Sequence, residues 1–167
     1  MKRGFTFVEL IIYVSVLAVI LLVFSNSVLS ISRSYGQLKI IRDLDSAAID
    51  SMERVTREIR AAASVDTIQS VLGTNPGVLF LNQVDSNGNN ASLKFSVTNS
   101  VLHIWQNGAD LGSLLPAGVT VRSLVFYLID TGGSKAVKVE MQLGETKGKV
   151  LRYSNYYSTV ILRGSYK

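Results

Sequence analysis

Hydrophobic and polar positions divide the chain into three stretches of different periodicity. Residues 5–24 are apolar almost without interruption, and Glu9 is the only charged residue among them. From Val28 to Ala62, apolar or small residues recur every three or four positions, the spacing of one face of an α-helix. Beyond Val65 the apolar residues form short runs separated by turn residues, which is typical of β-strands. The pattern predicts an α+β fold, with one long helix followed by a β-rich region.

The first stretch is long enough to span a membrane. Residues 5–24 would form a helix about 30 Å long, which matches the hydrocarbon thickness of a bilayer. Lys2 and Arg3 precede the stretch, and the next basic residue is Arg33. The positive-inside rule therefore predicts an amino terminus in the cytoplasm and export of everything beyond the span.

The second half of the helix is predicted to be amphipathic and to end at about residue 63. Its polar face carries charges of both signs, as expected for the exterior of a soluble helix or for subunit contacts. Asp50 with Arg54, and Glu53 with Arg57, have the i,i+4 spacing of favourable ion pairs.

Candidate strands follow the helix, and turn residues such as Asn107-Gly108 and Gly132-Gly133 separate them. The succession of hairpin signals predicts an antiparallel meander whose inner face covers the amphipathic half of the helix. The predicted strands are residues 78–84, 92–97, 101–106, 119–130, 136–143 and 150–162.

Glu9 is not explained by a simple membrane anchor. It lies about one turn inside the apolar stretch, where an ionised carboxylate is costly unless it has a partner. An acidic residue inside a membrane segment is therefore a candidate functional residue.

The residues around Glu9 read Lys-Arg-Gly-Phe-Thr-Phe-Val-Glu-Leu, which resembles the prepilin motif of type IV pilins and type II secretion pseudopilins. The resemblance implies that a membrane peptidase cuts between Gly4 and Phe5 and methylates the new amino terminus of Phe5. Lys2 and Arg3 would be the basic residues of the leader that is removed. Glu9 becomes the fifth mature residue, and the resemblance assigns it to assembly. During assembly the Glu9 carboxylate would pair with the Phe5 amine of a neighbouring subunit, so that two charges that are costly in a membrane neutralise each other.

The resemblance also implies a pilin-like fold, a location and a set of partners. The partners are a prepilin peptidase and methyltransferase, other pilin or pseudopilin subunits, and an inner-membrane assembly platform. The protein would be a single-pass inner-membrane protein first and part of a pilus or pseudopilus afterwards. The implied organisation is leader 1–4, membrane half 5–24, amphipathic half 25–63 and exported β-rich head 64–167.

A second resemblance concerns the kind of subunit. Residues 52–65 and 156–165 resemble the larger minor pilins and J- or W-type pseudopilins in the general pattern of their residue types. The prolines are Pro76 and Pro116, so the helix lacks the proline that many major pilins carry, which also suits a minor subunit. The alternative is an uncleaved single-pass anchor that carries a binding or receptor domain.

Composition narrows the candidate chemistry. With 47% hydrophobic and 17% charged residues, the chain is not of the disordered class. It has no Cys, which excludes disulfides and thiolate zinc sites, and its net charge of +5 comes from scattered residues. His103 is the only histidine, so we interpret it as a strand residue beside Trp105. We predict no enzyme activity, no cofactor and no metal site.

Two weaker patterns remain. Residues 85–89 resemble the start of an EF-hand calcium loop. Asn90 and Ser96 stand at the loop positions that require glycine and glutamate, so a hairpin turn is the favoured interpretation. An aromatic and basic group near the carboxyl terminus has the residue types that bind nucleic acid, although packing on the helix is the favoured interpretation. The group consists of Arg152, Tyr153, Tyr156, Tyr157, Arg163, Tyr166 and Lys167.

Overall fold

A computed structural model of the protein describes residues 6–84, 88–147 and 150–165. It confirms the α+β class, with one long amino-terminal helix and antiparallel sheets that pack on its second half. Helix α1 (Phe7–Ala61) is unbroken and ends two residues before the expected position. The chain forms two compact units, Met1–Lys39 and Ile40–Lys167, so that α1 contributes its first part to one unit and its last part to the other.

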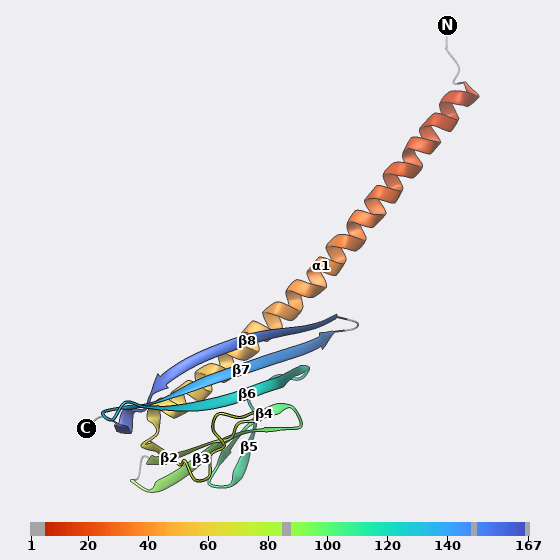
Figure 1. Ribbon diagram of the computed structural model, residues 1–167. Coiled ribbons are helices and arrows are strands. Elements are labelled where there is room, and N and C mark those ends of the chain that lie inside the picture. The colour runs from red at the N-terminus through yellow and green to blue at the C-terminus, as the bar shows by residue number, and fades with distance from the viewer. Residues whose placement is uncertain (1–5, 85–87, 148–149, 166–167) are drawn as a thin grey trace. The chain divides into compact units, whose positions relative to one another are not determined.

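All of the predicted strands are present (Figure 1). The structure adds two more. The added strands are β1, which extends the first sheet by two residues, and β5, which follows the Asn107-Gly108 turn. The elements are β1 (Ser64–Val65), β2 (Leu79–Val84), β3 (Asn90–Thr98), β4 (Val101–Gln106), β5 (Ala109–Ser113), β6 (Val119–Asp130), β7 (Lys135–Lys147), β8 (Val150–Ile161) and the 3₁₀ turn η1 (Arg163–Ser165).

The single meander predicted from the sequence is wrong, because the strands form two sheets. One has the order β1-β2-β3-β4-β5 and the other the order β6-β7-β8, all antiparallel. The division falls between Ser113 and Val119, where Pro116 has no N–H to donate to a ladder. The chain leaves the first sheet there and begins the second.

Tight turns account for the register of the first sheet. Asn107 and Gly108 both have positive φ, 52° and 85°, as a two-residue type I′ hairpin requires. Asn99 and Ser100 repeat this arrangement between β3 and β4, with φ of 51° and 62°. The predicted Asn107-Gly108 turn is therefore confirmed, and it brings β5 alongside β4.

Backbone hydrogen bonds join the two sheets. The Val121 N–H donates to the Ser100 carbonyl at 2.7 Å. The segment 73–77 runs along β6, where the Gly77 N–H donates to the Leu124 carbonyl at 2.7 Å. A Cβ on Gly77 would lie 3.0 Å from that carbonyl oxygen, so this close approach requires glycine. These contacts make the head one folded body.

One hydrophobic core lies between the last part of α1 and both sheets. The predicted helix face is buried from Leu44 to Ala62. Before it, Ile40 is buried, whereas Ile41 is 45% exposed. Small side chains at the contact let the sheet approach α1 closely, and the Ser51 hydroxyl donates to the Ala47 carbonyl at 2.7 Å.

The predicted ion pairs on α1 are wrong. Arg54 pairs with Glu58, Nε to Oε1 at 3.0 Å, in place of Asp50. Glu58 is the more sheltered acid, and it also accepts a hydrogen bond from Gln83 Nε2 at 3.0 Å. Asp50 is left without an ion-pair partner among the described residues.

Strand β8 is tied to the helix by a tyrosine. The Tyr156 hydroxyl donates to Asp45 Oδ1 at 2.7 Å, which joins positions 111 residues apart. Burial raises the pKa of Tyr156, and the neighbouring Asp45 carboxylate acts in the same direction.

We expect Tyr156→Phe to lower the free energy of unfolding by about 1 kcal/mol, because it deletes one hydrogen bond to a charged acceptor. The folded-state pKa is raised, so this contribution is complete at neutral pH and declines as the pH rises above about 10, where the unfolded tyrosine ionises. Thermal unfolding of the detergent-solubilised chain from pH 7 to 11 measures both effects. Tyr157→Phe is the matched control, because Tyr157 is 64% exposed and its change should have almost no effect. Equal effects of the two variants would contradict the assigned bond.

Candidate assembly site at the amino terminus

Glu9 closes a capping box at the start of α1. Its Oε2 accepts hydrogen bonds from the Thr6 backbone N–H and the Thr6 hydroxyl, both at 3.0 Å. In return the Thr6 hydroxyl accepts from the Glu9 backbone N–H at 3.3 Å. The Leu10 N–H donates to the Thr6 carbonyl at 3.2 Å, so Thr6 is the N-cap residue and Glu9 the third helical residue.

This local role was missed from the sequence, although the Thr-x-x-Glu signature of a capping box is present at residues 6–9. The cap fixes the carboxylate against the backbone N–H of the N-cap residue Thr6, where the positive end of the helix dipole also favours it. The bond to the Thr6 N–H places Glu9 Oε2 one residue from Phe5, whose nitrogen would become a free amine after a cut at Gly4.

The cap satisfies only part of the Glu9 carboxylate. No described cationic side chain lies within ion-pair distance of it, and Glu9 is exposed. The carboxylate is therefore positioned but not neutralised within the described chain. An acid in an apolar segment calls for an opposite charge.

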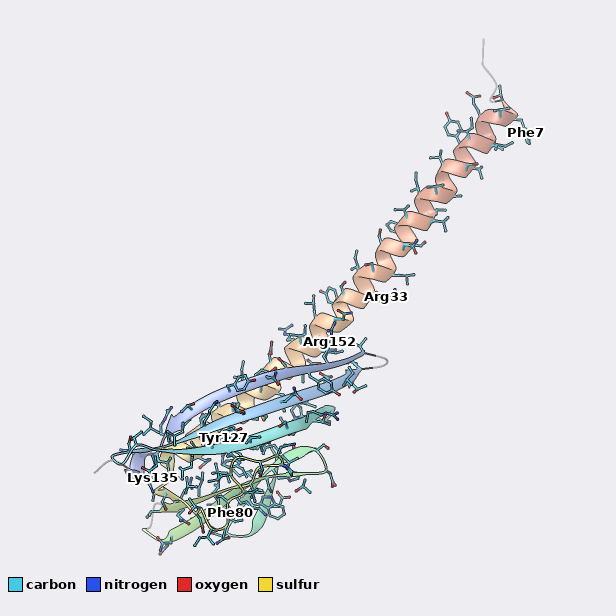
Figure 2. The ribbon with its side chains drawn as sticks, in the orientation of Figure 1. Phe7, Arg33, Phe80, Tyr127, Lys135 and Arg152 are labelled. Atoms are coloured by element: carbon cyan, nitrogen blue, oxygen red, sulfur yellow. The ribbon has the colours of Figure 1, made fainter. Side chains whose placement is uncertain are left out.

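The apolar surface of this part of α1 is exposed around its whole circumference. Figure 2 shows side chains on all sides of the helix between the labelled Phe7 and Arg33, and every residue from Phe7 to Lys39 is exposed. The helix is long and apolar enough to cross a membrane. The hydroxyl of Ser15 is satisfied within the helix, since it donates to the Ile11 carbonyl at 2.8 Å. Such a surface needs lipid or protein to cover it.

The remaining residues of the predicted processing site lie outside the described residues. These are Lys2, Arg3, Gly4 and Phe5. Glu9 is the one residue of the predicted site that the structure describes.

In the head, the only histidine has an acidic partner. His103 Nδ1 lies 2.9 Å from Asp110 Oδ2, across the β4–β5 pair. Trp105 follows two residues later on the same strand, with Lys94 Nζ 4.2 Å from its ring centre. Most of the calcium-like segment 85–89 lies outside the described residues, and no described group of three His, Asp or Glu is close enough to hold a metal.

The aromatic and basic residues near the carboxyl terminus are not brought onto one face. Tyr156 faces α1, whereas Tyr153 and Tyr157 point to the other side of β8, with Tyr153 beside Arg122 at 5.6 Å. Arg163 lies beyond the end of the strand, and Tyr166 and Lys167 lie outside the described residues. Figure 2 marks Arg152 near the start of β8, far along the strand from its end.

The chain matches no family model, no curated protein and no solved structure. Its long apolar amino-terminal helix on antiparallel sheets is compatible with a pilin-like fold. Function must therefore be argued from the residues themselves.

Proposed function

We propose that this protein is a structural subunit, a minor pilin or pseudopilin, of a type IV pilus or type II secretion-type filament. A prepilin peptidase would cut it after Gly4 and methylate Phe5. The amino-terminal helix would hold it in the inner membrane, with its head exported, until assembly buries the same helix inside the filament.

The observation that carries the proposal is the state of Glu9. Its carboxylate is held in place by Thr6 and has no described cationic partner, and it lies at the start of a helix whose side chains are all exposed as far as Lys39. A membrane anchor has no need for such a group and bears its cost. A subunit that must attract the amine of a neighbour needs a fixed, uncompensated anion at this depth.

The alternative is an uncleaved anchor with a binding or receptor domain. In that case Glu9 would serve only as the helix cap, and the terminus would stay intact. The two functions therefore differ in the mass of the mature chain.

Co-expression with a prepilin peptidase tests the proposal. We expect intact-protein mass spectrometry to show loss of residues 1–4 and gain of one methyl group. Gly4→Val should leave the chain uncut. Gly36→Ala is the matched control, because a Cβ at Gly36 meets nothing within 4 Å and the chain should be cut normally. An intact terminus in the presence of active peptidase would refute the proposal and favour the anchor.

A further inference from the structure

An acidic hollow of about 640 Å³ lies at one end of the head. Its charged lining comes from Asp43 and Asp50 on α1 and from Glu145 and Lys147 on β7. Lys147 Nζ lies 3.3 Å from Asp43 Oδ2 and 3.7 Å from Glu145 Oε1, so one cation is shared by two acids. Asp50 adds a third acid, because Arg54 turns away from it toward Glu58.

Lys147 does not satisfy the whole Glu145 carboxylate. The Glu145 side chain is only 9% exposed, and its Oε2 has no hydrogen-bond partner. A buried carboxylate oxygen without a partner is costly, so a donor is expected to reach it. The hollow therefore calls for a cationic donor from outside the described head.

The expected donor is a basic side chain. The described acids are not grouped closely enough to hold a metal ion. The hollow is far larger than an ion, and Leu115, Pro116 and Val119 supply an apolar wall beside the carboxylates. An arginine fits this combination, because its methylene stem packs on apolar surface while its guanidinium bonds to carboxylates.

A second hollow, of about 550 Å³, has the opposite charge. Arg60 and Arg163 line it together with Thr159, Val160 and Ile161 at the end of β8. Both arginines are exposed, and neither has an acidic partner among the described residues. The acidic hollow carries three acids and one lysine, and this one carries two arginines, so the formal charges are −2 and +2.

The two hollows lie at opposite ends of the head. Along β7, Glu145 is nine residues from Ala136, the register partner of Ile161, which corresponds to about 30 Å. Along α1, Asp43 and Arg60 are seventeen residues apart, or about 25 Å. They also lie at opposite edges of the second sheet, one beside β6 and the other beside β8. A contact that joins unlike surfaces of identical chains is heterologous, and it extends into an open array when each copy is also displaced along the axis, so that no ring closes.

We propose that the acidic hollow of one copy receives the arginines of a second copy of this chain, Arg60 foremost. Within the head unit, copies whose residues 43–60 run parallel make this contact only when one is displaced along that part of α1 by about 25–30 Å. The proposal rests on the filament function above and deepens it, because it names a second copy as the partner and these two hollows as the contact.

The absence of native cysteines allows a direct test with the full-length chain in detergent. Ser46→Cys places a thiol in the acidic hollow, and Thr159→Cys places one in the arginine hollow. With a flexible bis-maleimide, the double variant should give a ladder of dimers, trimers and larger products. Each single variant should stay monomeric, because the contact never brings two identical positions together.

Charge substitutions in the double-cysteine chain identify the contact. Asp50→Arg and Arg60→Glu should each reduce the ladder about tenfold or more, and the two combined should restore it. Glu53→Arg, an equal charge change on the same helix outside the hollow, should leave it intact.

Several results would overturn this proposal. They are dimers from either single variant, a ladder that neither charge reversal reduces, or cross-linking of the acidic hollow only to a different subunit. A chain that is cut after Gly4 but forms no ladder loses this contact and keeps the filament function. A chain that forms the ladder but stays uncut keeps this contact and loses the filament function.

Discussion

Glu9→Val is expected to leave membrane insertion and cutting after Gly4 intact and to reduce incorporation into filaments strongly. The substitution removes the only acid in residues 5–24, so the amine of a neighbouring Phe5 would enter the filament without a counter-charge. At about 3 kcal/mol for one uncompensated charge in hydrocarbon, incorporation should fall about a hundredfold. Quantitative immunoblots of sheared filament and membrane fractions measure this ratio.

The capping box requires a control for this result, since Glu9→Val also removes a helix cap. Glu9→Gln retains a side-chain oxygen that accepts from Thr6 but carries no charge, and it should fail in incorporation like Glu9→Val. Thr6→Val loses the hydroxyl and keeps the charge, and it should be incorporated. If Glu9→Gln assembled normally while Thr6→Val did not, the residue would be a cap and the pairing role would be wrong.

Phe126→Ala is expected to lower the free energy of unfolding of the head by about 3–5 kcal/mol. Phe126 is 0% exposed in β6, where its ring packs in the core and lies against the segment at Gly77. Its removal leaves a cavity that surrounding strands cannot fill. Thermal or urea unfolding of the detergent-solubilised chain, followed by circular dichroism, gives the change.

Phe80→Ala is the matched comparison for that core substitution. Phe80 is half-buried in β2, with Lys94 Nζ 5.8 Å from its ring centre, and its loss should cost about 1 kcal/mol. A smaller effect at Phe126 than at Phe80 would contradict the position of the core.

The sequence was most informative where periodicity was long. The helix needed only the three-to-four-residue spacing from Val28 to Ala62, and β6 to β8 had long apolar runs with explicit turns. Strand β5 reads Ala-Asp-Leu-Gly-Ser, with no β-branched residue, so only the preceding Asn107-Gly108 turn indicated it. The division into two sheets was not predictable, because it depends on pairing between distant strands.

The candidate site was predictable in part. Glu9 stood out as a charge in apolar surroundings, and a Thr-x-x-Glu search would also have found its cap. The acidic hollow could not be found this way, since Asp50 and Glu145 are 95 positions apart and meet only through packing of β7 on α1. The i,i+4 spacing favoured Arg54 as the partner of Asp50. In the fold Arg54 pairs with Glu58, which is less exposed to solvent.

Mass spectrometry of filaments sheared from cells that produce this chain tests the central claim most directly. The account predicts that the chain is present in the filament fraction with an amino-terminal peptide that begins at methylated Phe5. A chain found only in the membrane fraction, with residues 1–4 still attached, would contradict it.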